Sequence, residues 1–143
     1  MSPESGVLDD QAIHGVLDTS AVIALGNLDP SSLPTEPLIT AITLAELTVG
    51  PLVATSAAER AARQAHLQQA EADFDPLPFD AAAARTFGRV AASLRAAGRK
   101  PSARAFDALI AATAMSRDLP VFTANRSDFE GIEGLDVREV TPR

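Results

Sequence analysis

The sequence predicts an α/β domain built around a mostly parallel sheet. Short apolar runs typical of buried strands are separated by helical patterns almost throughout the chain, and strands that alternate with helices form parallel sheets. The 143 residues are enough for one domain with its own core. No internal repeat is visible, so we expect one folded unit over residues 14–143. Residues 1–13 contain Gly, Pro and acids without periodicity and are expected to form a loose extension.

The first half of the chain contains two predicted strands and three predicted helices. Thr19 or Ser20 can cap the first helix. Pro37 bounds the second strand, and the Gly50-Pro51 pair interrupts the second helix. The third helix carries little apolar bulk, which indicates a peripheral position. The expected elements are strands over 15–19 and 38–42 and helices over 20–28, 43–49 and 55–74.

The second half contains two further helices and two further strands. Asp80 is placed to cap the first helix, and Gly98 ends it. The next helix is apolar on every side from Ala108 to Met115 except at Thr113, so we expect it to be buried against the sheet. The last strand alternates in polarity and is expected at an edge. The expected elements are helices from 81 to 97 and from 103 or 105 to 117, and strands over 120–124 and 135–140.

Asp18 directly follows the first apolar run, and the sequence around it organises the prediction of function. The acid is expected at the carboxyl end of a strand, and ligands bind at that edge in open α/β sheets. The alternative is an ordinary turn acid or helix cap. Glu46 is expected on the first turn of the second helix at the same edge. Its alternative is a capping box with Thr43, in which the glutamate serves its own helix end.

Asp107 begins an otherwise apolar helix, where an unpaired carboxylate is costly to bury. A metal would stabilise it, and the alternative is an ion pair with Arg104. Asn125 and Asp128 follow the third strand, and each alone is an ordinary turn residue. Together these oxygen donors, without Cys or a well-placed His, predict a site for Mg²⁺ or Mn²⁺ rather than Zn²⁺. Such a cation supports phosphoryl chemistry.

The distribution of charge along the chain changes what the negative net charge implies about partners. A net charge of −7 argues against a nucleic-acid partner. Residues 81–106, however, contain no acid and hold half of the 12 basic residues. This stretch is either a surface for RNA phosphates or a solvated helix face. Its basic residues are Arg85, Arg89, Arg95, Arg99, Lys100 and Arg104.

Cysteine usage and hydropathy indicate a cytoplasmic protein. The chain has no cysteine, which suits a reducing compartment. We find no apolar run long enough to span a membrane and no secretory signal pattern at the start.

Four segments in order resemble the PIN-domain ribonucleases, and within them the VapC-type toxins of bacterial toxin–antitoxin pairs. The resemblance implies a three-layer α/β/α fold and a homodimeric, metal-dependent endoribonuclease that is inhibited by a VapB-like antitoxin. It further suggests structured RNA, such as transfer or ribosomal RNA, as substrate. The matching segments are 17–21, 43–47, 104–114 and 122–129.

The family pattern also assigns roles to residues of this chain. Asp18, Glu46 and Asp107 would be the catalytic, metal-holding acids. Family members differ in which later position carries a fourth acid. Because position 125 is Asn here, we choose Asp128 as the fourth catalytic and metal-holding acid. Thr19, Thr123 and Asn125 are expected to support the acids, and Arg99, Lys100 and Arg104 to bind RNA.

Other functions are compatible with parts of the pattern. A PIN-like module without catalysis would bind RNA or protein only, but such a module has no need of clustered acids. A receiver-type phosphoacceptor needs a lysine near its acids, and Lys100 is expected in a loop between helices. A histidine ribonuclease would have to use His14 and His66 as acid and base. Metal-dependent attack by water instead predicts 5′-phosphate and 3′-hydroxyl product ends.

Overall fold

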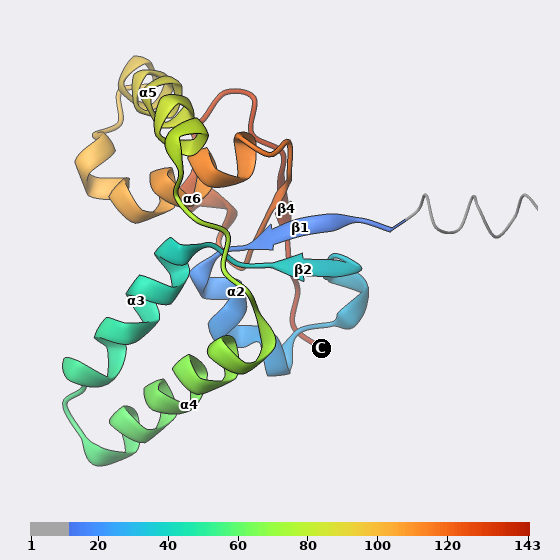
Figure 1. Ribbon diagram of the computed structural model, residues 1–143, viewed down its shortest axis with the longest axis vertical. Coiled ribbons are helices and arrows are strands. Elements are labelled where there is room, and N and C mark those ends of the chain that lie inside the picture. The colour runs from blue at the N-terminus through green and yellow to red at the C-terminus, as the bar shows by residue number, and fades with distance from the viewer. Residues whose placement is uncertain (1–11) are drawn as a thin grey trace, which may run out of the picture.

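The computed structural model describes residues 12–143, and four parallel strands form its central sheet (Figure 1). The predicted extension over residues 1–13 lies outside the described residues up to position 11. The sheet order is β2-β1-β3-β4, with β1 in the interior and β2 and β4 at the edges. The prediction of a mostly parallel sheet is therefore confirmed. The strands are β1 (His14–Leu17), β2 (Glu36–Leu38), β3 (Val121–Thr123) and β4 (Val137–Glu139).

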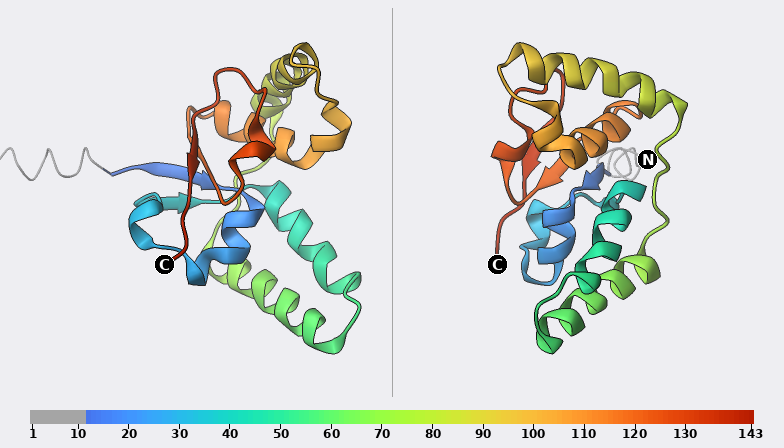
Figure 2. Two further views of the ribbon diagram at one scale, coloured as in Figure 1. Left: turned by 180° about the vertical axis from the view of Figure 1, so that it is seen from behind. Right: turned by 90° about the vertical axis from the view of Figure 1, so that its left-hand side faces the viewer.

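Helices connect the strands and cover both faces of the sheet (Figures 1 and 2). Short 3₁₀ turns η1 to η4 cover Leu25–Asn27, Pro30–Ser32, Pro101–Arg104 and Arg126–Phe129. The α-helices are α2 (Thr19–Ala24), α3 (Ala41–Leu52), α4 (Ala57–Asp73), α5 (Ala81–Ala96) and α6 (Ala105–Met115).

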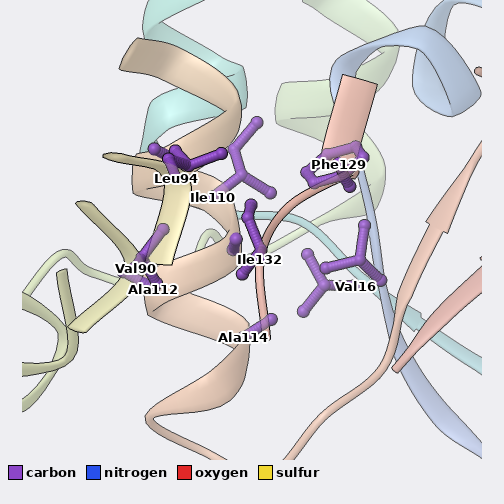
Figure 3. Close-up of a cluster of buried hydrophobic side chains, with 11 residues drawn as sticks. Val16, Val90, Leu94, Ile110, Ala112, Ala114, Phe129 and Ile132 are labelled. Atoms are coloured by element: carbon purple, nitrogen blue, oxygen red, sulfur yellow. The ribbon is translucent and has the colours of Figure 1, made fainter. Parts of the chain in front are cut away.

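Side-chain alternation along the strands divides the core into two clusters, one on each face. Val16 and Val121 belong to the cluster on the face covered by α5 and α6. Figure 3 shows Val16 and Leu94 in this cluster. Leu17 and Phe122 point to the opposite face, covered by α2, α3 and α4. Successive residues of a strand face opposite sides. The two clusters therefore confirm the three-layer α/β/α arrangement.

Helix α6 is buried against the sheet, as its apolar sequence predicts. Its residues Ala108, Ile110, Ala111 and Ala112 have no exposed surface. Asp107 lies in the first turn of α6, near enough to Asp18 and Glu46 for their charges to act on it. Figure 1 shows β1 and β2 pointing to one side of the molecule, between α6 and α3.

The second strand and the second helix differ from the prediction. Strand β2 covers Glu36–Leu38 instead of 38–42, and Pro37 lies inside it. Proline is tolerated there because β2 is an edge strand. Helix α3 begins at Ala41, and it continues through Gly50 and Pro51 to Leu52. Pro51 forfeits one helical hydrogen bond in the final turn, where the helix ends anyway.

The other elements match their predictions to within a few residues, apart from the first helix. That helix ends at Ala24 and continues as the 3₁₀ turn η1 instead of reaching residue 28. Asp80 caps α5 by accepting a hydrogen bond from the Ala83 amide at 3.0 Å. Gly98 follows α5 with a φ of 77°, a backbone conformation that glycine adopts without strain. None of the helices within residues 12–143 has the length and apolarity to cross a membrane.

Candidate active site

Asp18 lies at the carboxyl end of β1 and is almost fully buried, with 2% of its surface exposed. Its Oδ1 accepts hydrogen bonds from the Ser20 hydroxyl at 2.7 Å and the Ala21 amide at 2.9 Å. Its Oδ2 accepts one from the Thr123 hydroxyl at 2.6 Å. Burial raises the pKa of Asp18, and these hydrogen bonds offset part of that rise. Asp18 itself caps α2, so the expectation that Thr19 or Ser20 would cap it is wrong.

Glu46 reaches the same edge from the second turn of α3, not the first, because the helix begins at Ala41. The Thr19 hydroxyl donates to Glu46 Oε1 at 2.6 Å and lies 3.0 Å from the Thr43 hydroxyl. Helix α3 is capped by Thr40, whose hydroxyl accepts from the Thr43 amide. The capping box between Thr43 and Glu46 is therefore excluded. Burial raises the pKa of Glu46, and the charge of Asp18 raises it further.

Asp107 lies in the first turn of α6 and is half-buried. The hydrogen bonds of residues 12–143 include none to its carboxylate. Burial and then the negative charges of Asp128, Asp18 and Glu46 raise its pKa from 3.8 to about 6. Four carboxylates from four different segments therefore act on one another at this edge of the sheet.

Asp128 lies in η4 and forms an ion pair that the sequence did not indicate. Its Oδ1 is 2.6 Å from Nη1 of Arg104 and accepts a hydrogen bond from the side-chain amide of Asn125 at 3.1 Å. Arg104 was considered as a partner of Asp107, but its ion pair is with Asp128. The positive charge of Arg104 also lowers the pKa of Asp107, as the weakest of the influences on it.

The three basic residues expected to bind RNA lie beside this cluster in sequence and differ in their partners. Arg99 pairs with Glu130 at 3.1 Å, Arg104 pairs with Asp128, and Lys100 is exposed between α5 and η3. The two histidines lie elsewhere, His14 at the start of β1 and His66 in α4. They do not meet as an acid–base pair at the acid edge.

The donor set fits a hard divalent cation. It consists of carboxylate oxygens, and the raised pKa values mean that added positive charge would relieve their mutual repulsion. Among the residues that the structure describes, no group of three or more His, Cys, Asp or Glu side chains is arranged to hold a metal ion. The cluster therefore supplies oxygen donors and negative charge, but not a complete set of metal ligands as its side chains lie in this structure.

Sequence reasoning missed two hydroxyl residues of the site. Ser20 bonds Asp18 and also accepts from the Ala124 amide at 3.1 Å, which ties the ends of β1 and β3 together. Thr43 lies beside Thr19. A hydroxyl two residues after a strand-end acid was the available signal for Ser20. The contact at Thr43 depends on where α3 begins, which the sequence pattern misplaced.

A large cavity lies away from these acids. It has a volume of about 900 Å³ and is lined by residues such as Leu119, Pro120 and Asp136, which precede β3 and β4. The acid cluster follows β1 and β3, at the opposite edge of the sheet. The candidate chemistry is therefore in the cluster and not in this cavity.

Comparison with known proteins gives a consistent family. Residues 15–135 match the PIN domain. The chain is 43% identical to Ribonuclease VapC5 of Mycobacterium tuberculosis over 129 residues, which cover 88% of this chain and 93% of that protein. It is 38% identical to Ribonuclease VapC8 of the same species over 70% of this chain and 89% of the relative.

A solved structure supports the same family. The crystal structure of VapBC-5, a toxin–antitoxin system of Mycobacterium tuberculosis, matches with a TM-score of 0.77 and 42% identity, covering 90% of this chain and 98% of the matched one. The family match spans most of the chain, and the curated and structural relatives agree with it. The chain therefore belongs to the PIN-domain family and, within it, to the VapC ribonucleases.

Proposed function

We propose that this VapC-type protein is a metal-dependent endoribonuclease that cleaves structured RNA, such as transfer or ribosomal RNA. The observation that carries the proposal is the convergence of four carboxylates, Asp18, Glu46, Asp107 and Asp128, from four segments at one edge of the sheet. In keeping with it, burial and the charges of the other three acids raise the pKa of Asp107 to about 6. Carboxylates that destabilise one another in this way are typical of sites that bind a cation. The family membership supplies the reaction class.

Asp18, Glu46 and Asp107 would hold the cation, Mg²⁺ or Mn²⁺, and Asp128 adds a fourth negative charge. When bound, the cation would neutralise the acids, polarise the phosphate and favour ionisation of a water. Asp18 is held rigidly by three hydrogen bonds, and Glu46 by Thr19. These contacts would fix the carboxylates in place as the substrate binds.

Attack by water would form a bond to phosphorus and break the bond to the 3′ oxygen. The products would therefore carry 5′-phosphate and 3′-hydroxyl ends. Arg99, Lys100 and Arg104 would bind RNA phosphates beside the acids.

Residues 14–143 would form one nuclease domain, and the protein would act in the cytoplasm.

A VapB-like antitoxin and a second copy of the chain are the partners we propose. Three apolar side chains are exposed at the end of α3, and the solved relative is a toxin–antitoxin system. An exposed apolar patch of this kind supports a protein partner. A guanidinium or ammonium group from the antitoxin would suit the acid cluster. The exposed side chains are Val49 at 51%, Leu52 at 83% and Val53 at 60%.

Cleavage of end-labelled RNA with Mg²⁺, with Mn²⁺ and with EDTA tests the proposal. We expect cleavage only with metal, and a loss of at least about a hundredfold in Asp107→Asn. Asp75→Asn, an exposed acid between α4 and α5, is the matched control and should retain full activity. Cleavage in EDTA, or 2′,3′-cyclic phosphate ends, would contradict the mechanism. A PIN-like protein without catalysis, which only binds RNA or protein, would show no cleavage in any condition.

A further inference from the structure

The ion pair between Arg104 and Asp128 joins two segments that flank the acid cluster. Arg104 ends η3, just before Asp107, and Asp128 lies in η4 after β3. The 2.6 Å separation is short for an ion pair, and the two side chains are only 31% and 26% exposed. Partial burial reduces solvent screening, so this contact should hold its geometry better than a surface ion pair.

Asp128 is itself held by hydrogen bonds that lead back to the most buried acid of the site. Asn125 donates to Asp128 through its side chain and receives a hydrogen bond from Ser127 at 2.7 Å. The backbone amide of Asn125 donates to the Thr123 hydroxyl at 3.0 Å, and that hydroxyl donates to Asp18. A chain of contacts therefore runs from Asp18 through β3 to Arg104.

The guanidinium of Arg104 has donors to spare. It carries five N–H donors, and the hydrogen bonds of residues 12–143 give it one acceptor, Asp128. A planar guanidinium can donate to phosphate oxygens with its remaining edge while one nitrogen stays on a carboxylate. Its charge reaches Asp107, since Arg104 lowers the pKa of that residue.

We propose that Asp128 is a positioning residue that holds the Arg104 guanidinium where it meets the phosphate of bound RNA. This proposal rests on the proposed function and gives Asp128 a role through Arg104 instead of through the metal. This role predicts a change in RNA affinity opposite to the change that charge alone predicts. Removing a negative charge near RNA normally strengthens binding, but removing Asp128 should weaken it, because Arg104 loses its orientation.

The affinity for a short, labelled single-stranded RNA, measured in EDTA, tests the direction of this change without requiring cleavage. We expect Asp128→Asn, Asp128→Ala and Arg104→Ala each to weaken affinity about fivefold to twentyfold. The double variant Asp128→Ala/Arg104→Ala should be no weaker than Arg104→Ala alone, because the two residues act as one unit. Glu130→Gln, from the more exposed pair with Arg99, is the matched control and should leave affinity unchanged or raise it slightly.

Manganese affinity of the same proteins, measured by electron paramagnetic resonance without RNA, separates the two roles of Asp128. We expect the affinity of Asp128→Asn to stay within about twofold of wild type, whereas Asp107→Asn should lose at least about tenfold. Tighter RNA binding by Asp128→Asn, or a tenfold loss of its manganese affinity, would overturn the positioning role. Circular dichroism checks that each variant is folded. If the protein binds RNA but never cleaves it, the proposed function fails while the RNA-binding comparison still decides this inference.

Discussion

At the scale of single residues, Asp18 shows that a structural and a functional role can coincide. As a helix cap it accepts a hydrogen bond from the Ala21 amide, and as a cluster acid it contributes charge that raises the pKa of Asp107. Burial without compensation would make its carboxylate costly. The hydroxyls of Ser20 and Thr123 reduce that cost, and so allow a charged group at the end of a buried strand.

Asp107→Asn should stabilise the metal-free protein at pH 7.5 by about 1–2 kcal/mol, since solvent screening reduces the full cost of the half-buried charge. The folded-state pKa, about 6, lies above the ordinary value of 3.8. The stabilising effect of the proton is therefore complete below about pH 4 and is lost as the pH rises through 6. Wild type and variant should be equally stable at pH 4 and diverge between pH 4 and 7.

Urea unfolding in EDTA across this pH range measures the difference. Asp75→Asn should follow wild type at every pH, because Asp75 is exposed and lies outside the cluster. A variant that is less stable than wild type at pH 7.5 would contradict the prediction, as would a difference independent of pH.

At the scale of elements, β1 packs closely against β3 through a glycine. A Cβ added at Gly15 would lie 2.3 Å from Cε1 of Phe122 and 3.1 Å from Cβ of Pro34. The Phe122 ring belongs to the buried cluster beneath α2. It also lies under the Arg138 guanidinium, whose Cζ is 5.7 Å from the ring centroid. The ring therefore has little room to move.

Gly15→Ala should reduce the free energy of unfolding by about 1–3 kcal/mol, because the ring or the strand must shift. Gly88→Ala in α5 is the matched control. A Cβ there meets no atom within 4 Å outside its own helix, so this substitution should stabilise by about 0.5–1 kcal/mol. Chemical denaturation of both variants at pH 7 gives the comparison. Equal stability of Gly15→Ala and wild type would show that β1 and β3 can separate without cost.

The segment from the end of α5 to η3 is the element expected to bind RNA. In an Asp107→Asn background that does not cleave, replacing Arg99, Lys100 and Arg104 by alanine should flatten the dependence of log affinity on log salt. Each lost phosphate contact changes the slope by about 0.7–0.9. Affinity measured at several salt concentrations gives the slope.

The matched control for this segment replaces the other basic residues of α5, Arg85, Arg89 and Arg95, by alanine. These substitutions remove the same formal charge without touching the segment next to Asp107. We expect a smaller change in slope from them. If the slope stays the same when the three residues beside the cluster are removed, that segment is only a solvated face.

At the scale of the whole molecule, α3 and α4 form a helical hairpin that extends away from the sheet (Figure 1). The exposed Leu52 lies at the far end of α3. Leu52→Asp should weaken association with the antitoxin at least about tenfold and leave cleavage by the free protein unchanged. Ala84→Asp, on α5 at the other face of the sheet, should change neither.

Co-purification and isothermal titration with the antitoxin measure this effect. The same complex tests whether a basic side chain of the antitoxin reaches the acid cluster, because its binding should then weaken in Asp107→Asn. An antitoxin that binds both variants as tightly as wild type would place its contacts elsewhere on the molecule. Light scattering of the free protein tests the predicted homodimer.

The sequence alone determined the features that depend on local pattern. Apolar runs and their periodicity are enough to locate β1, α5, α6 and β3, because each element must bury its own apolar face. The position of Asp18 at a strand end follows from where its apolar run stops. Asp107 similarly follows from the start of an apolar helix. The family segments added the expectation that these acids converge.

Only the tertiary structure decided the partners of the site residues. The start of α3 at Ala41 depends on Thr40 as cap and on an edge strand that tolerates Pro37. The contact of Thr19 with Glu46 follows from that start. Arg104 is near Asp107 in sequence but pairs with Asp128, 24 residues later. Such pairings depend on how helices and strands pack and bring together side chains that are far apart in the sequence. No local sequence pattern predicts which of them will meet.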